Sequence, residues 1–315
     1  MRRSIGTKNM FDILVAGEIN PDLILSGNVI PDFGQVEKLV DAATLSVGSS
    51  SAIFACGAAR LGLKVGFIGL CGDDIFGHFM LDEMRKHNID VSNVIVRADG
   101  QTGLSVILSQ GPDRAILTHP GLIPFLKAED ITDSLFRQTR HLHIASCFLQ
   151  TSLQAGLPRL FERAHQFGIT TSLDTNWDPQ ERWDSVREIL PLVDVFLPNA
   201  AEACAIADMK NVRDAAIHLA EKTKIVAVKL GADGALGAQN HQLIQKSSLK
   251  VKVIDTVGAG DSFDAGFLYG YLKGWELEKA LRMGVVCGSL STRSCGGTES
   301  QPTLEEALSH AKLSG

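Results

Sequence analysis

The sequence predicts an α/β fold, with a doubly wound, mostly parallel sheet, helices on both of its faces, and a small separate β-sheet. Three observations carry this prediction. Short apolar runs alternate along the chain with segments of helical period, two stretches without a helical period interrupt that alternation, and 315 residues with 45% hydrophobic content suffice for one large core.

The apolar runs have the length and composition of buried strands, and the segments between them have apolar faces that repeat every 3.6 residues. This alternation is typical of βαβ units, which build parallel sheets. The predicted strands are FDILVAG (11–17), KVGFIGL (64–70), HLHIA (141–145), TTSLD (170–174), DVFLP (194–198) and KIVAVKLG (224–231), and the predicted helices include Ile75–His87, Ser152–Phe167 and Val212–Lys222.

The two interrupting stretches are residues 20–47 and 101–121. In the second, TGLSVILS and RAILTH flank the turn GPD in the manner of a β-hairpin. Each stretch leaves a core element and returns to it, so we expect the two to pair as a small sheet that forms a lid over one edge of the core. The predicted core then comprises residues 1–19, 48–100 and 122–315.

Composition narrows the class of partner. The formal charge is −6 with acidic and basic residues interspersed, which argues against a nucleic acid or an anionic membrane and favours a small-molecule ligand. No apolar run approaches the ~18 residues that span a bilayer, and MRRSIGTKNMFD lacks a secretory apolar stretch, so we expect a cytoplasmic protein. The six cysteines form no CxxC pair, and we expect neither a disulfide framework nor a zinc site.

The sharpest local pattern is VKVIDTVGAGDSFDAGFLYGYL (251–272). Here a predicted apolar strand at 251–254 leads into the turn Gly258-Ala259-Gly260, and an apolar helix opens at Asp261. Glycines allow the backbone to aim several N–H groups at one point, and the start of a helix adds partial positive charge there. The pattern therefore predicts an anion site at residues 258–261.

A carboxylate beside an anion site repels the anion, so Asp261 requires an explanation. If Asp261 accepts the proton of a substrate hydroxyl while the Gly258–Asp261 amides stabilise a moving phosphoryl group, both halves of a phosphotransfer site are present. The alternative is that Asp261 merely caps its helix.

The wider pattern resembles the second signature of the ribokinase-like (PfkB) carbohydrate kinase family, close to D-T-x-G-A-G-D-x-F-x-x-G. The matching residues are Asp255, Thr256, Gly258, Ala259, Gly260, Asp261, Phe263 and Gly266. This resemblance implies a ribokinase-like fold, Asp261 as the general base, and the Gly258, Ala259 and Gly260 amides as the anion hole for the phosphoryl group of ATP.

The resemblance extends to substrate-binding motifs near the start of the chain. In GEINPD (17–22), Asn20 and Asp22 occupy the places of the residues that hold sugar hydroxyls in the family. VGSSSAIFACGAARLG (47–62) resembles the first signature, with Gly48 and Ser49 at its two glycine positions. It departs from that signature at Ile53, where the family has an asparagine that contacts the sugar.

Nucleotide and cation sites follow from the same resemblance. Asn199 and Glu202 match its N-x-x-E motif and, three apart on a helix, could orient waters around Mg²⁺, although a solvated helix start with a glutamate near the helix dipole explains the pair equally well. Lys229, Gly231 and Gly234 are expected along ATP together with Thr256, while a plain β-turn also accounts for the two glycines. The family further implies a K⁺ ion between Asp255 and the turn Gly296-Gly297.

We therefore expect an ATP- and Mg²⁺-dependent kinase. The expected acceptor is a small neutral sugar, fructose- or ribose-like, or a nucleoside, because the lid segments offer few cations beyond Lys38 and Arg114. The alternatives are a phosphosugar or sugar-acid kinase and a catalytically silent sugar or nucleotide sensor. A homodimer formed through the lid is expected by analogy with the family. The motifs G-x-G-x-x-G after the first strand and G-x-x-x-x-G-K-[ST], which a dehydrogenase and a P-loop enzyme require, are absent.

Overall fold

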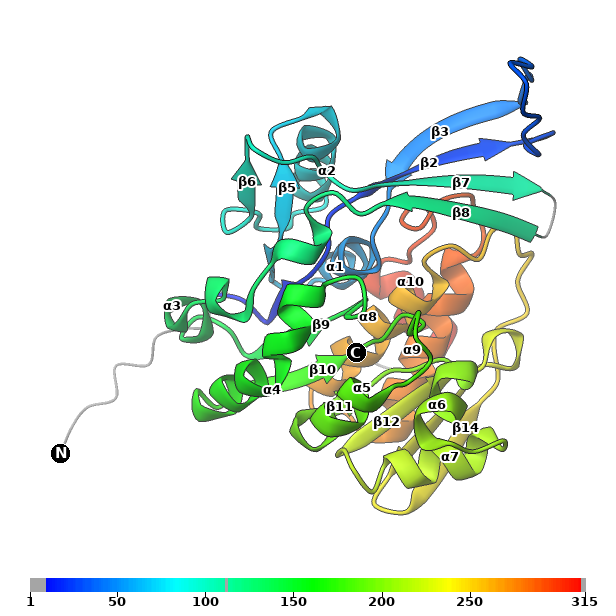
Figure 1. Cartoon of the computed structure of the whole chain (residues 1–315). Coiled ribbons are helices and arrows are strands. Elements are labelled where there is room, and N and C mark those ends of the chain that lie inside the picture. The colour runs from blue at the N-terminus through cyan, green and yellow to red at the C-terminus, as the bar shows by residue number, and fades with distance from the viewer. Residues whose placement is uncertain (1–9, 111–112, 313–315) are drawn as a thin grey trace.

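The computed structural model describes residues 10–110 and 113–312. Its centre is an eight-stranded sheet in the order β14-β13-β12-β11-β10-β9-β1-β4 (Figure 1). The strands from β4 to β12 pair in parallel, while β13 and β14 add an antiparallel edge. The bounds are β1 (Ile13–Ala16), β4 (Val65–Ile68), β9 (His141–Ile144), β10 (Thr170–Leu173), β11 (Val195–Phe196), β12 (Ile225–Lys229), β13 (Ala235–Gln239) and β14 (Gln242–Lys246). The predicted mostly parallel sheet is confirmed.

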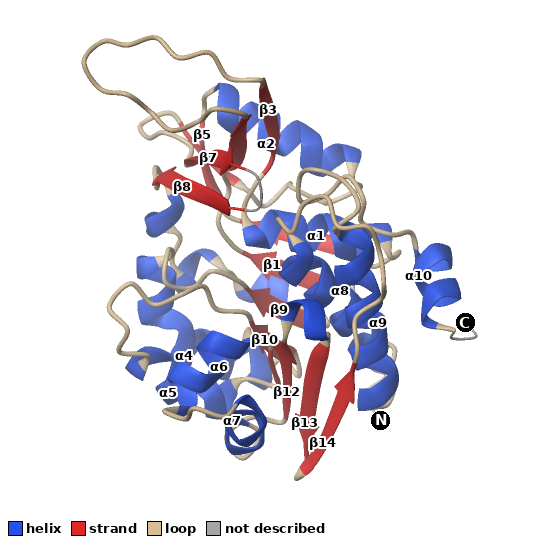
Figure 2. Cartoon of the chain, turned by 90° about the vertical axis from the view of Figure 1, so that its right-hand side faces the viewer, coloured by secondary structure: helices blue, strands red, loops and turns tan. Residues whose placement is uncertain are grey.

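Helices cover both faces of this sheet (Figure 2). The cause lies in the two-residue period of the strands, which sends alternate apolar side chains to opposite faces. Ile13 and Val15 belong to one apolar core, while Leu14 and Ala16 belong to the other. The first core packs under α1 (Ser50–Arg60), α2 (Ile75–Lys86), α8 (Ala259–Leu272), α9 (Leu277–Ser291) and α10 (Leu304–Ala311), and the second under α3 (Asp133–Phe136), α4 (Thr151–Gln166), α5 (Asp184–Ile189), α6 (Ala200–Ala207) and α7 (Val212–Leu219).

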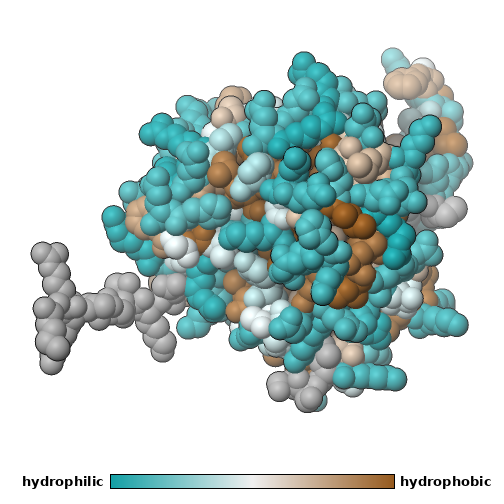
Figure 3. Space-filling model, turned by 90° about the horizontal axis from the view of Figure 1, so that it is seen from below, coloured by the Kyte–Doolittle hydropathy of each residue, from teal (hydrophilic) through white to brown (hydrophobic). Residues whose placement is uncertain are grey.

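On the surface seen from below Figure 1, hydrophilic residues predominate between smaller apolar areas (Figure 3). No helix in the described ranges is long and apolar enough to cross a membrane.

A second sheet of four strands projects from one end of the core (Figure 1). Its order is β3-β2-β7-β8, and β2 pairs in parallel with β7 and antiparallel with β3. The strands are β2 (Pro21–Ser26), β3 (Ala42–Val47), β7 (Leu104–Gln110) and β8 (Asp113–His119). The two interrupting stretches thus pair as expected, and residues 111–112 of the predicted hairpin turn lie outside the described residues.

One predicted strand is wrong. Residues 251–254 form a loop, in which Val253 and Ile254 are 57% and 54% exposed. The sheet ends at β14, and this apolar run adds no further strand to it. It lies instead along the walls of two cavities, described below.

Candidate active site

Charged side chains gather at the carboxyl ends of the parallel strands, where ligands bind in sheets of this kind. Glu18 follows β1, Asp174 follows β10, and Lys229 is the last residue of β12. The amino terminus of α8 lies against the same edge, because the Nζ atom of Lys229 is 3.0 Å from Oδ2 of Asp264 in that helix.

The turn before α8 has the backbone that its glycines allow. Gly258 has a left-handed φ of 71°, and a Cβ atom there would lie 2.8 Å from the Cα atom of Gly297 and from Cγ2 of Ile53. Helix α8 begins at Ala259, with Gly258 as its N-cap residue and no side-chain cap. Asp261 lies inside the first turn, so it is not the helix cap, and its carboxylate remains available for other work.

The surroundings of Asp261 disfavour the ionised form of its carboxyl group. Burial raises its pKa well above the ordinary value, and the carboxylates of Asp174 and Glu18 raise it further. The ammonium of Lys229 and a hydrogen bond from the side chain of Ser50 lower it. A proton acceptor with raised basicity is what the removal of a hydroxyl proton requires.

Lys229 lies beneath the glycine turn. Its Nζ atom is 2.8 Å from Oδ1 of Asp174 and 3.0 Å from Oδ2 of Asp264. A Cβ atom on Gly260 would lie 3.6 Å from the Cδ atom of Lys229 and 3.8 Å from its Nζ atom. Oxygens of Asp174, Asp261 and Asp264 all lie within 4.8 Å of one another. Lys229 therefore lies among three acids.

The first of two cavities beside this turn measures about 670 Å³. The structure brings Lys229, Gly231, Gly234 and Thr256, four residues expected along ATP, together in its wall. Gly231 and Gly234 have positive φ values of 59° and 95°, in the short turn between β12 and β13. Much of the remaining wall is apolar, and it includes Leu249, Val251, Phe263 and Val285.

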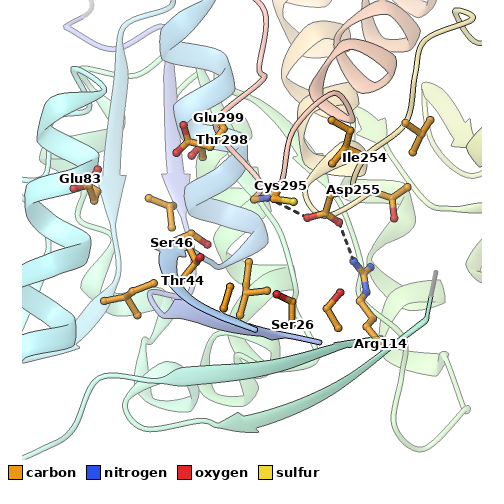
Figure 4. Close-up of a pocket in the computed structure, with 18 of the residues that line it drawn as sticks. Ser26, Thr44, Ser46, Glu83, Arg114, Ile254, Asp255, Cys295, Thr298 and Glu299 are labelled. Atoms are coloured by element: carbon orange, nitrogen blue, oxygen red, sulfur yellow. Dashed lines mark hydrogen bonds and ion pairs between the residues drawn. The ribbon is translucent and has the colours of Figure 1, made fainter. Parts of the chain in front are cut away.

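The second cavity, of about 900 Å³, lies between the small sheet and the core (Figure 4). Ser26, Thr44, Ser46 and Arg114 face it from the small sheet, and Asp255, Cys295 and Glu299 from the core. Val253 and Thr256 line both cavities. The loop that leads into the anion turn is thus the wall between the two.

Asp255 ties this loop to its surroundings. Its Oδ1 atom accepts a hydrogen bond from the Val257 amide and its Oδ2 atom one from the Gly296 amide, both at 3.0 Å. The Nη1 atom of Arg114 approaches Oδ1 to 4.0 Å from the small sheet (Figure 4). Asp255 and Gly296 are therefore neighbours, as the expected K⁺ site requires, and the ion itself stays a prediction.

The expected sugar-binding residues also come together. The Nδ2 atom of Asn20 donates to Ser105 Oγ at 3.2 Å and to Asp22 Oδ1 at 3.4 Å. Burial raises the pKa of Asp22 to about 6, against the lowering effects of Ser105 and Arg114. A Cβ atom on Gly48 would come within 2.2 Å of Asp22 Oδ1.

Ser49 and Ile53, also in the first signature, serve α1. The Ser49 hydroxyl donates to the Glu18 carbonyl at 2.7 Å and accepts from the Ala52 amide at 3.0 Å, so it is the side-chain cap of the helix. Ile53 is 3% exposed and packs against Gly258 and Gly297. Its apolar side chain fills a place where the family uses an amide.

Asn199 and Glu202 form a reciprocal capping box at the start of α6. Asn199 Oδ1 accepts from the Glu202 amide, and Glu202 Oε2 accepts from the Asn199 amide, both at 2.9 Å. Burial and Asp174 raise the pKa of Glu202 to about 7, while Lys229 lowers it. A buried carboxylate whose charge is disfavoured in this way fits a place beside a divalent cation, which would favour the charged form.

Sequence reasoning did not assign roles to Glu18, Ser50 or Asp264. A signal exists for the two acids: Glu18 directly follows a buried strand, and Asp264 is a charge within the apolar helix pattern DSFDAGFLYGYL. Buried charges of this kind require partners. Nothing in the local pattern distinguishes Ser50 from its serine neighbours.

Known proteins share this fold and identify the family. Residues 10–304 match the family described as pfkB family carbohydrate kinase. A 5-dehydro-2-deoxygluconokinase from Geobacillus thermodenitrificans is 32% identical over 294 residues, which cover 85% of this chain and 86% of that protein. A second protein of this name, from Listeria monocytogenes, is 28% identical over 306 residues, which cover 90% and 94% of the two chains.

Solved structures share the fold. Arabidopsis thaliana ribokinase, solved with ribose and ATP, has a TM-score of 0.83 at 21% identity over 96% of this chain and 99% of its own. An E. coli chain solved with ATP and Mg²⁺ has a TM-score of 0.85 at 22% identity, with 96% and 99% of the two chains covered.

The fold and the family match together define a carbohydrate kinase. The chain belongs to the pfkB family.

Proposed function

We propose that this kinase transfers the γ-phosphoryl group of ATP to a hydroxyl of a sugar acid of the 5-dehydro-2-deoxygluconate type, with Asp261 as the general base. The observation that carries the mechanism is the shared wall at Val253 and Thr256. A donor in the 670 Å³ cavity and an acceptor in the 900 Å³ cleft would meet at the end of that wall, beside the turn Gly258–Asp261.

The chemistry follows from the groups at this meeting point. Asp261 takes the proton of the acceptor hydroxyl, the acceptor oxygen forms a bond to the γ-phosphorus, and the bond from that phosphorus to the bridging oxygen of ADP breaks. The amides of Gly258, Ala259 and Gly260 stabilise the charge on the phosphoryl oxygens in transit. Near this turn, Ser50 donates to Asp261.

Mg²⁺ would neutralise charge on the ATP phosphates. Glu202 and Asn199 are the residues proposed to hold it through water, and Asp255 with the Gly296 turn is proposed to hold K⁺. Lys229, Gly231, Gly234 and Thr256 are proposed to line the bound nucleotide. Support comes from their common cavity and from the fold shared with the E. coli chain solved with ATP and Mg²⁺.

The proposed acceptor class rests on Arg114 and on the relatives' names. Arg114 is the one cation among the described residues that line the cleft, whereas Lys38 pairs with Asp32 at 3.1 Å and does not line it. A guanidinium can bind a carboxylate through two parallel hydrogen bonds, so one arginine suffices for a sugar acid. The neutral acceptor expected from the sequence has no such support from the sequence relatives, and the ribokinase solved with ribose shares only the fold, at 21% identity.

A coupled ATP-consumption assay tests the acceptor class. The panel comprises 5-dehydro-2-deoxygluconate, fructose, ribose, adenosine and fructose 6-phosphate, and the sugar acid is expected to give the highest kcat/KM. A higher kcat/KM with a neutral sugar or with a phosphosugar would contradict the proposed acceptor. No turnover with any member would favour a sugar or nucleotide sensor.

We further propose that the small sheet is a lid and that its outer strand, β8, pairs two subunits. All of β8 is exposed, including Ile116 at 52% and Leu117 at 62%. Light scattering after gel filtration is expected to give the mass of a dimer, and Ile116→Lys is expected to shift it to that of a monomer. A monomeric wild-type protein would exclude this interface.

A further inference from the structure

The largely buried ammonium of Lys229 lies close to the proposed catalytic base. Its side chain is 13% exposed, and its two partners come from different parts of the fold, Asp174 from the end of β10 and Asp264 from α8. Oxygens of both partners lie within 4.8 Å of an oxygen of Asp261. One ammonium therefore faces three carboxylates. Without this ammonium, ionisation of all three carboxylates would cost much free energy.

The charged groups around Asp261 are unbalanced. Three acids face it: Asp174 just after β10, Glu18 just after β1, and Asp264 from its own helix. The cation that interacts with it is Lys229, from β12. Without that cation, burial and the three acids would all favour the protonated carboxyl, which cannot accept a proton.

We propose that Lys229 is a positioning residue of the phosphoryl-transfer step, whose ammonium, anchored by Asp174 and Asp264, keeps the neighbouring carboxylate of Asp261 available as a proton acceptor. The proposal rests on the proposed role of Asp261 as base. It gives Lys229 a task distinct from contact with the nucleotide. It also gives a reason for Asp264, which is 0% exposed and whose Oδ1 atom has no hydrogen-bond partner among the described residues.

The competing explanation is structural: the ion pairs could simply fasten α8 to the sheet. The two explanations differ in the sign of an electrostatic effect. Removal of the Lys229 charge should raise the pKa of Asp261, because a favourable neighbour is lost. Removal of the Asp174 charge should lower it, because an unfavourable neighbour is lost. If the ion pairs only held α8 to the sheet, both variants would destabilise the fold. They would not shift the pKa of Asp261 in opposite directions.

The test is a carbon-13 NMR titration of the ligand-free protein with carboxyl-labelled aspartate, in which Asp261 is assigned by the signal that Asp261→Asn removes. We expect Lys229→Met to move the Asp261 midpoint upward by about one pH unit or more, and Asp174→Asn to move it downward by a similar amount. Lys229→Arg should return it towards the wild-type value. Lys224→Met is the control, since Lys224 pairs with Asp194 just before β12, at the opposite end of that strand from Lys229.

Shifts in the same direction, or a midpoint unmoved by Lys229→Met, would overturn the proposal. If Lys229→Met does not fold, Lys229→Gln replaces it. If neither folds, Asp174→Asn decides alone, and an unchanged or raised midpoint rejects the proposal. Because this titration needs no acceptor, its outcome is independent of the acceptor panel. Single-turnover rates with ATP and 5-dehydro-2-deoxygluconate should show the same displacements in the acid limb of the pH profile.

Discussion

Gly48 lies directly against the carboxylate of Asp22, so closely that a Cβ atom on Gly48 would be 2.2 Å from Asp22 Oδ1 and 2.8 Å from the Asn20 carbonyl oxygen. Two motifs that lie 26 residues apart in the sequence thus depend on each other sterically. The first predicted experiment follows from this contact.

Gly48→Ala should displace Asp22 and weaken acceptor binding. We expect KM for the acceptor to rise about tenfold or more, with KM for ATP nearly unchanged, because a misplaced hydrogen-bonding carboxylate costs at least about 1.4 kcal/mol. Steady-state kinetics with each substrate varied in turn measures both. Gly62→Ala is the control for a general loss of stability, because an added Cβ there would meet nothing within 4 Å, whereas its φ of 87° strains the backbone away from Asp22. An unchanged acceptor KM in Gly48→Ala would refute the assigned role of Asp22.

Asp261→Asn should abolish most turnover without loss of nucleotide binding. The amide keeps the shape of the carboxylate but cannot accept the hydroxyl proton, so kcat should fall by roughly 10²–10⁴-fold. Calorimetric titration with ATP should give a Kd close to that of the wild type. If the variant turns over at a near-normal rate, Asp261 is not the base.

Arg114→Ala should separate acidic from neutral acceptors. We expect KM for 5-dehydro-2-deoxygluconate to rise by roughly 10–100-fold, because a charged hydrogen bond in the cleft is lost, while the weak activity with a neutral sugar should be unaffected. Arg114→Lys should recover only part of the loss, since lysine lacks the fork of donors. An equal effect on both acceptors would show that Arg114 acts by holding Asp255 rather than by recognising a carboxylate.

Protonation of Asp22 at low pH should weaken acceptor binding and, in the opposite sense, stabilise the fold. Its pKa is raised from 3.8 to about 6 in the folded protein, so below pH 6 it is protonated and acceptor KM should rise. An acid with a raised folded pKa binds more protons in the folded than in the unfolded chain between those values. The stabilisation of the fold by this extra proton binding is therefore fully present below the unfolded pKa. It is lost as the pH rises through about 6.

Denaturant unfolding at pH 5 and pH 8 measures this loss. The wild-type free energy of unfolding should decline between the two pH values, and the decline should be smaller in Asp22→Asn by roughly 1–1.5 kcal/mol. Asp32→Asn is a suitable control, because Asp32 belongs to a surface ion pair with Lys38 and is 56% exposed at its side chain. Identical pH dependence in wild type and Asp22→Asn would contradict the raised pKa.

Local patterns in the sequence were sufficient for most of the fold and for the glycine turn before Asp261. The alternation of Ile13, Leu14 and Val15 between two cores follows directly from strand geometry, and the glycines of the turn before Asp261 lie next to it in the chain. The apolar run 251–254 misled the strand prediction, because apolar side chains that line a cavity have the composition of a buried strand.

Long-range electrostatics could not be predicted in the same way. Lys229 is 55 residues from Asp174 and 35 from Asp264, and no periodicity links them. The pair Asn199 and Glu202 shows the opposite difficulty. Its spacing serves a capping box and a cation site equally well, and the structure shows the capping box directly, whereas the cation remains a proposal.

The wall that Val253 and Thr256 share between the two cavities has a consequence for the hydrolysis of ATP by water. In the proposed mechanism, ATP would occupy one cavity and the acceptor the other, and transfer would take place where the two cavities meet. With the nucleotide in its proposed cavity, water would reach this junction mainly through the acceptor cleft. Fidelity against hydrolysis is then governed by how completely the sugar and the sheet above it fill the larger opening.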